Sequence, residues 1–139
     1  MKRENRVMFY LLSFTWGLLW TMLGLLTALV IVIVFVKEVK VTKFQGRLRI
    51  HFRNRDFGGA SMGVVIITSG NFDDIELIRH ELGHTVQSAW LGPLFIPLIA
   101  IPSAIRYQYR TWTKKPLKTK YDDIWFEGWA TRLGYKYFY

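Results

Sequence analysis

The feature that most constrains this chain of 139 residues is the run from Val7 to Val36, which contains no charged side chain. About 20 apolar helical residues cross the hydrocarbon core of a bilayer, whereas this run would form a helix about 45 Å long, so it must tilt, protrude or break near Gly24. Two arms of about 14 residues would each be too short to span. The run therefore predicts one long, tilted transmembrane helix.

The flanks of the run indicate an anchor that is not cleaved. The start of the chain is positively charged, as in a secretory signal, but the apolar run is about twice the usual length and no small-residue cleavage site follows it. We therefore divide the chain into a basic N-terminus (residues 1–6), a transmembrane anchor (7–36) and a membrane-associated domain (37–139).

The formal net charge of +9 is concentrated beside the apolar segments, which favours anionic lipid headgroups of a bilayer and the cytoplasmic side of a membrane. The chain lacks a nucleic-acid motif and its aromatic residues fit an interface belt, so we expect no nucleic acid as a partner. The absence of cysteine excludes disulfides. We predict an integral membrane protein whose domain after the anchor lies on the cytoplasmic side. Two basic clusters follow the apolar segments: Lys37, Lys40, Lys43, Arg47, Arg49, Arg53 and Arg55, and then Arg106, Arg110, Lys114, Lys115, Lys118 and Lys120.

Small residues recur along the anchor at spacings of four, three and four, which places them on one face of a helix. In lipid such a stripe allows another helix to approach closely. We expect its partner to be the second apolar segment of this chain or a second copy, although small residues also occur in transmembrane helices without partners. The stripe consists of Gly17, Thr21, Gly24 and Ala28.

Beyond the anchor the pattern indicates an α+β domain. We expect a β-hairpin of Lys43–Phe52 with Ser61–Thr68, because both stretches are rich in β-branched residues and turn formers separate them. An amphipathic helix then begins at Asp73, which forms a capping box with Glu76. The next apolar stretch, 91–105, is broken by three prolines and too short to span, so it lies at or dips into the membrane; the alternative is a buried connector. A C-terminal helix closes the domain.

The expected amphipathic helix contains "RHELGH", residues 79–84. Shuffling this composition would produce His-Glu-x-x-His in only about 2 chains per thousand. Residues i and i+4 share a helix face, so His80 and His84 can bind one zinc ion, while the carboxylate of Glu81 can accept a proton from water at the metal. The alternative is a pair of histidines hydrogen-bonded on a polar helix face.

Two histidines need a third protein ligand to complete such a site. The candidates are His51, which lies on an expected strand, and the acidic residues Asp122, Asp123 and Glu127 of the C-terminal segment. On a helix Asp123 and Glu127 share a face with small residues, which would allow close approach to the helix that carries the two histidines. We predict Glu127 as the ligand, and Asp123 as the group that holds a ligating histidine N–H or replaces Glu127.

His80, Glu81, His84 and Glu127 together resemble the gluzincin group of zinc metallopeptidases, whose metal is bound by two His and one Glu. "RHELGHTVQSAWLGPLFIPLIAIPSAI" and "FEGWATRLG" further resemble a family of small bacterial membrane proteins, over about residues 63–134. The resemblance implies that His80, His84 and Glu127 bind zinc and that Glu81 is the general base. It also implies a location in the bacterial cytoplasmic membrane, with this catalytic part on the cytoplasmic side. Thr131 lies at the position where such families often have Asp or Asn, whose side chain hydrogen-bonds to a metal ligand and orients it.

This resemblance implies zinc-assisted hydrolysis, with the oxyanion stabilised by zinc and a further donor such as Tyr121 or a membrane-proximal arginine. The strand from Met62 to Thr68 precedes the metal helix, as the substrate-pairing edge strand does in many metallopeptidases, so we expect a peptide or membrane-proximal protein segment as substrate. The alternatives are a lipid or small-molecule substrate, a catalytically silent relative that binds metal or a partner, and a structural membrane subunit without metal.

Overall fold

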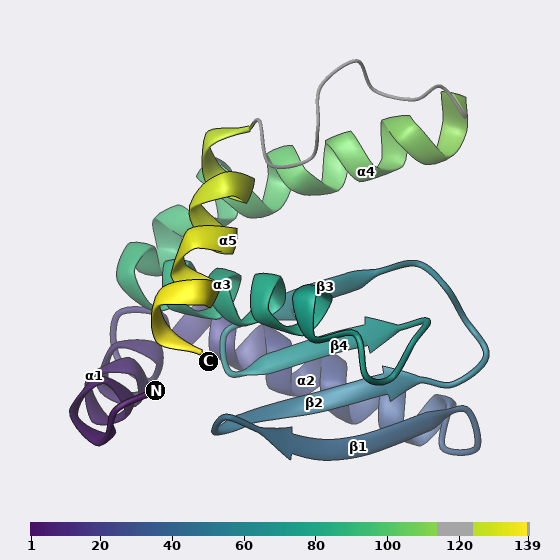
Figure 1. Cartoon of the computed structure of the whole chain (residues 1–139), viewed down its shortest axis with the longest axis horizontal. Helices are drawn as coiled ribbons and strands as arrows, with labels where there is room; N and C mark the ends of the chain where they lie inside the picture. Colours follow the sequence, from purple (N-terminus) through teal and green to yellow (C-terminus); the bar gives the residue numbers. More distant parts are fainter. Residues whose placement is uncertain (114–123, 139) are drawn as a thin grey trace.

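The computed structural model describes residues 1–113 and 124–138, which form a four-stranded sheet and five α-helices (Figure 1). The predicted α+β class is confirmed. A 3₁₀ turn (Gly92–Leu94) and a π-helical turn (Ile96–Ala100) connect α3 to α4. In chain order the elements are α1 (Arg3–Ser13), α2 (Leu18–Val34), β1 (Val39–Phe44), β2 (Arg47–Phe52), β3 (Gly59–Met62), β4 (Val65–Ser69), α3 (Ile75–Leu91), α4 (Ile101–Thr113) and α5 (Trp125–Tyr137).

The sheet has the strand order β1-β2-β4-β3. The β1–β2 and β3–β4 pairs are antiparallel hairpins, whereas β2 and β4 run parallel. Gln45 and Gly46 close the first hairpin with φ values of 48° and 82°, and Gly63, with φ 61°, lies in the second turn. The predicted single hairpin of Lys43–Phe52 with Ser61–Thr68 is therefore wrong, because each of these stretches contains a reversal of the chain.

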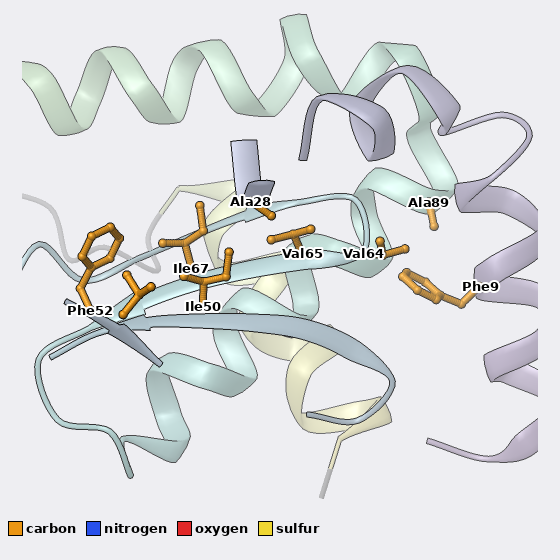
Figure 2. Close-up of a cluster of buried hydrophobic side chains, with 9 residues drawn as sticks. Phe9, Ala28, Ile50, Phe52, Val64, Val65, Ile67 and Ala89 are labelled. Carbon is orange, nitrogen blue, oxygen red and sulfur yellow. The ribbon is translucent and has the colours of Figure 1, made fainter. Parts of the chain in front are cut away.

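Helices cover both faces of the sheet, α2 on one side and α3 on the other. Successive side chains of a strand point to opposite faces, and β4 follows this rule. Val65 and Ile67 pack with Ala28 of α2, in the cluster that Figure 2 shows, whereas Ile66 packs with Leu82 of α3. Three consecutive residues of the strand, Val65 to Ile67, are thus apolar because both of its faces are buried.

The predicted single helix over residues 7–36 is wrong, since α1 and α2 meet at an angle of 90°. The break lies at residues 14–17 and not near Gly24. A Cβ on Gly17 would lie 3.3 Å from the carbonyl oxygen of Ser88, and a Cβ on Gly92 would lie 2.4 Å from Nε1 of Trp16. The chain therefore turns where it contacts the C-terminal end of α3, a contact that hydropathy does not reveal.

The second apolar segment is helical and strongly bent relative to α3. Its Phe95 and Ile99 are buried beside Phe126 of α5, whereas α4 contains no buried residue. Among the described helices, none is by itself long and apolar enough to cross a bilayer. Two helix pairs satisfy the requirement only jointly, α1 with α2 at 90° and Ile75–Leu94 with Ile96–Thr113 at 119°.

The small-residue stripe of α2 lies against the chain's own β3–β4 hairpin. A Cβ on Gly24 would be 2.2 Å from the carbonyl oxygen of Met62, and a Cβ on Gly63 would be 2.5 Å from Cα of Thr21. Thr21, Gly24 and Ala28 are buried there. The stripe thus allows a helix to approach a sheet closely, while self-association through it stays a prediction.

Two arginines of the first basic cluster are buried, so they do not face a headgroup as expected. Arg47 is 0% exposed, and its guanidinium lies 3.6 Å from the ring centroid of Phe9 and 4.8 Å from that of Phe138. Arg49 is 3% exposed and donates to Thr68 and to the carbonyl of Phe72. Both residues support the fold from the α3 side of β2. Lys114, Lys115, Lys118 and Lys120 lie outside the described residues.

Candidate metal centre

Helix α3 carries the two histidines, which confirms the predicted helix. It begins one residue later than expected, because Asp74, and not Asp73, is the N-cap and accepts a hydrogen bond from the backbone N–H of Leu77 at 3.1 Å. His80 and His84 are one turn apart, with ring centroids separated by 4.8 Å. Both imidazoles consequently face the same neighbouring helix, α5.

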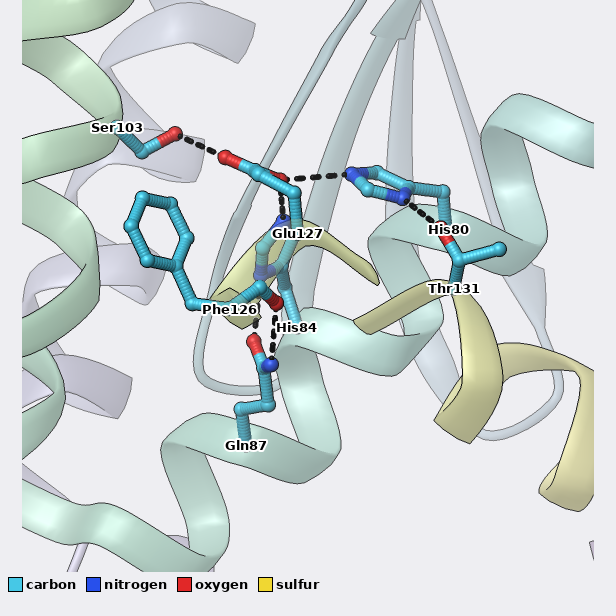
Figure 3. A network of polar contacts seen from close by, with 7 residues as sticks. All are labelled: His80, His84, Gln87, Ser103, Phe126, Glu127 and Thr131. Atoms are coloured by element: carbon cyan, nitrogen blue, oxygen red, sulfur yellow. Dashed lines mark hydrogen bonds and ion pairs between the residues drawn. The ribbon is translucent and has the colours of Figure 1, made fainter. Parts of the chain in front are cut away.

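Helix α5 brings the third candidate ligand, Glu127, between the two rings (Figure 3). Its Oε2 lies 3.1 Å from Nε2 of His80 and 3.0 Å from Nε2 of His84. One ligand atom from each residue lies within 4.8 Å of the others. Glu127 is completely buried, as expected for a carboxylate that serves a site and not the surface. The group can therefore hold a metal ion.

The backbones of α3 and α5 touch at two small residues, which allows this approach. A Cβ on Gly83 would lie only 1.9 Å from the carbonyl oxygen of Ala130. A Cβ on Gly134 would lie 2.2 Å from the carbonyl oxygen of Arg79. The expected small face of the C-terminal helix, Ala130 with Gly134, is thus the surface that packs on α3.

The hydrogen bonds around His84 fix which of its nitrogens faces Glu127. Nε2 of Gln87 is 2.7 Å from the carbonyl oxygen of Phe126, which can only accept, so the amide nitrogen of Gln87 must donate there. The other amide atom, Oε1, accepts from Nδ1 of His84 at 2.7 Å. In the neutral ring Nε2 is then an acceptor directed at a carboxylate oxygen, which is also an acceptor. A proton or a metal cation must lie between them.

Two further hydroxyl groups hold the remaining atoms of the centre. Oγ1 of Thr131 lies 2.9 Å from Nδ1 of His80, and Oγ of Ser103 donates to Oε1 of Glu127 at 2.9 Å. Such outer hydrogen bonds orient metal ligands and fix their tautomers. Thr131 therefore contacts a candidate ligand from the position where the resembling families often have Asp or Asn.

The charges of the metal-free centre stabilise one another. Burial opposes ionisation of Glu127, but hydrogen bonds with His80 and His84 outweigh it and hold the pKa of this carboxyl well below its usual range. Burial lowers the pKa of His84, yet the hydrogen bond with Glu127 and the nearby Glu81 raise it overall. A cation at this position is thus favoured by the surrounding groups, whether it is a proton or a metal.

Glu81 lies beside the centre, against β3. It is 5% exposed, and a Cβ on Gly59 would lie 2.7 Å from its Oε1, so a larger residue at position 59 would displace this carboxylate. Burial raises the pKa of Glu81, with His84 and His80 opposing the rise. Among the described residues none makes a hydrogen bond to its buried Oε2. A carboxylate that has a raised pKa, and one oxygen to which no described residue donates a hydrogen bond, is suited to accept a proton.

Two hollows meet at Glu81 and together form a cleft along β3. One has a volume of about 340 Å³ and the other of about 610 Å³. Both are lined by Phe57, Gly59, Glu81 and Tyr107. The smaller hollow is also lined by His84, and the larger one by His80. The candidate metal centre is therefore open to a ligand from the side of β3 and α4.

The other predicted ligand candidate among the described residues, His51, lies apart from this group. His51 is buried on β2, where its Nδ1 is 3.0 Å from Oγ1 of Thr68 and its ring packs on Phe72. Tyr121, Asp122 and Asp123 lie outside the described residues.

Two residues that contact the candidate ligands, Gln87 and Ser103, were not predicted from the sequence. Gln87 follows His84 by three residues on the same helix, so its spacing could have indicated a contact. Ser103 reaches the centre from α4, and only the bend between α3 and α4 brings it there.

Comparison of the chain with protein-family models, curated proteins and solved structures finds no match.

Proposed function

We propose that this protein is a zinc-dependent hydrolase that cleaves a peptide bond in a membrane-proximal polypeptide segment. The observation that carries the proposal is the convergence of His80, His84 and Glu127 beside Glu81 at an open cleft. Two imidazoles and one carboxylate are a known ligand set for catalytic zinc. The donors fit the ion, because both Nε2 atoms and a carboxylate oxygen face one point.

Zinc bound there would supply a Lewis acid for the scissile carbonyl and would lower the pKa of water. The residues of the chain provide the other requirements. Glu81 accepts the proton of the attacking water and can return it to the leaving amine. Gln87 and Thr131 hold the ligating imidazoles from their Nδ1 side, and Ser103 holds the free oxygen of Glu127.

The edge of the sheet supports a peptide as substrate. β3, and not the predicted stretch Met62–Thr68, is the edge strand next to the cleft, because most of that stretch belongs to the internal strand β4. Gly59 through Met62 line the apolar hollow. The outer backbone groups of β3 can pair with an extended polypeptide, which would cross Glu81 at Gly59.

The exposed apolar surface supports a membrane location. Soluble surfaces rarely expose large contiguous apolar patches, and three helices carry bulky apolar side chains on their outer faces. We propose that these faces contact lipid, with basic side chains at anionic headgroups. The exposed residues include Val7, Met8 and Leu11 of α1, Leu19, Leu26, Val30 and Ile33 of α2, and Ile101 and Ile105 of α4.

The experiment combines metal analysis with the Glu81→Gln variant. Wild-type protein and variant are purified in detergent, their zinc content is measured, and both are incubated with a peptide library that is analysed by mass spectrometry. We expect one zinc per chain in both proteins, and a loss of hydrolysis of about 10²- to 10⁴-fold in the variant, because only the proton acceptor is removed.

Glu38→Gln is the matched control, since Glu38 carries the same carboxylate but pairs with Arg55 at the surface and lines neither hollow. It should keep both zinc and activity. Wild-type protein without zinc would refute the metal centre, and unchanged hydrolysis by Glu81→Gln would refute the role of Glu81 as base.

A further inference from the structure

The smaller hollow of the cleft has apolar walls contributed by three separate parts of the chain. Trp20 comes from α2, Met62 from β3, and Phe95 and Ile99 from the bent connection after α3. Beside Phe57, Tyr107, Glu81 and His84, the rest of the wall is made of small residues, which leave the space open: Gly59, Ala60, Ser61, Ala100, Ser103 and Ala104. An apolar cavity of about 150 Å³ can hold a benzene ring, so 340 Å³ is enough for a large apolar side chain.

The larger hollow, on the other side of Glu81, has a different chemistry. Glu76, His80, Arg110 and Thr131 contribute polar or charged groups to its walls. The two hollows therefore divide one cleft into a strongly apolar half and a more polar half, and Glu81 lies where they meet. A segment bound along β3 would have its scissile bond at this change of polarity.

The apolar half lies between the helices with exposed apolar faces. Next to Trp20 on α2, Leu19 and Leu23 are 56% and 39% exposed. Next to Ala104 on α4, Ile105 is 64% exposed. An apolar segment that enters this half would come from the lipid that, under the proposed function, the exposed faces of these two helices contact.

We propose that the site takes an extended polypeptide in which a bulky apolar residue is followed or preceded by polar ones, as where a membrane-spanning segment leaves the bilayer. The apolar side chain next to the scissile bond fills the hollow between Trp20, Phe95 and Ala104. The polar residues on the other side of that bond lie along Glu76 and Thr131. This inference rests on the proposed zinc peptidase function and names its substrate class.

The test measures binding, so it does not depend on turnover. Two peptide hydroxamates that differ only in Leu or Gly beside the metal-binding group are titrated into zinc-loaded protein by calorimetry in one detergent. Burying a Leu side chain should strengthen binding about 10- to 100-fold over Gly. In Ala104→Phe the new ring fills the hollow, so this preference should disappear while the affinity for the Gly compound changes little.

Ile105→Phe is the matched control, because it adds a similar ring one residue away and outside the hollow. It should keep the preference for Leu. Ala104→Leu is the second, smaller substitution should Ala104→Phe not fold, and it should reduce the preference partly. Equal binding of the Leu and Gly compounds by wild-type protein, or an undiminished preference in a folded Ala104 variant, would overturn the proposal.

Two further results separate this proposal from the one on which it rests. Wild-type protein that takes up no zinc refutes the peptidase function itself. Zinc-loaded protein that binds both hydroxamates equally refutes only the apolar subsite. A simple alkyl hydroxamate that matches the Leu peptide in affinity, and loses it equally in Ala104→Phe, would assign the hollow to an acyl chain and overturn the polypeptide as substrate.

Discussion

Replacing Gly83 by alanine tests whether the contact between α3 and α5 builds the metal centre. The added Cβ would lie 1.9 Å from the carbonyl oxygen, 2.6 Å from the carbonyl carbon and 3.0 Å from the Cα of Ala130. All three are backbone atoms, so no side-chain rotation can relieve the clash. Since ordinary contact begins at 3.4 Å, α5 must move away from α3 by about 1.5 Å.

Glu127 lies one turn before Ala130 on α5 and would move with it. A displacement of about 1.5 Å greatly exceeds the tolerance of about 0.2 Å on metal–ligand distances, so zinc affinity should fall by at least the 10- to 100-fold typical of outer-shell changes. Overpacking costs about 1–3 kcal/mol, while the better helix propensity of alanine returns about 1 kcal/mol. The free energy of unfolding of the metal-free protein should thus fall by about 2 kcal/mol or less.

The assay is a competition titration of zinc against a chromogenic chelator, with thermal unfolding of the chelator-treated protein measured in parallel. Arg132→Ala is the control, because Arg132 is exposed on α5 and its loss requires no movement of the helix. It should leave zinc affinity unchanged. A Gly83→Ala protein that binds zinc as tightly as wild type and unfolds at a higher temperature would refute the close contact of the two helices.

Three other changes have expected outcomes. Glu127→Ala should lower zinc affinity by more than 100-fold in the same titration, and affinity equal to wild type would contradict its role as a ligand. Thr131→Val, which keeps the shape but removes the oxygen at Nδ1 of His80, should lower zinc affinity about 10- to 100-fold, and an unchanged value would show that the contact is dispensable. Gly24→Leu should lower the melting temperature of detergent-solubilised protein while membrane insertion persists, because its Cβ would meet the carbonyl oxygen of Met62 at 2.2 Å; unaltered melting would contradict the packing of α2 on the hairpin.

The candidate metal centre could be predicted in part because the sequence patterns that indicate its residues lie within single helices. The positions of His80 and His84 on one face follow from the pitch of a helix alone. Glu127 could be chosen because it shares a helical face with Ala130 and Gly134, which leave room for a neighbour. No pattern within one helix could indicate that Glu127 contacts both histidines, because the packing of α3 on α5 joins residues about 40–50 positions apart.

The sequence by itself therefore determined the α+β class, the helix that carries His80 and His84, and the candidate ligands, since each depends on periodicity or residue chemistry within one element. Only the tertiary structure decided the bend after α1, the parallel pairing of β2 with β4, and the approach of Ser103 to Glu127. These features arise from contacts between distant segments, such as Trp16 against Gly92. Hydropathy records how apolar a segment is, but the packing of one segment on another determines where the chain turns and which strands pair.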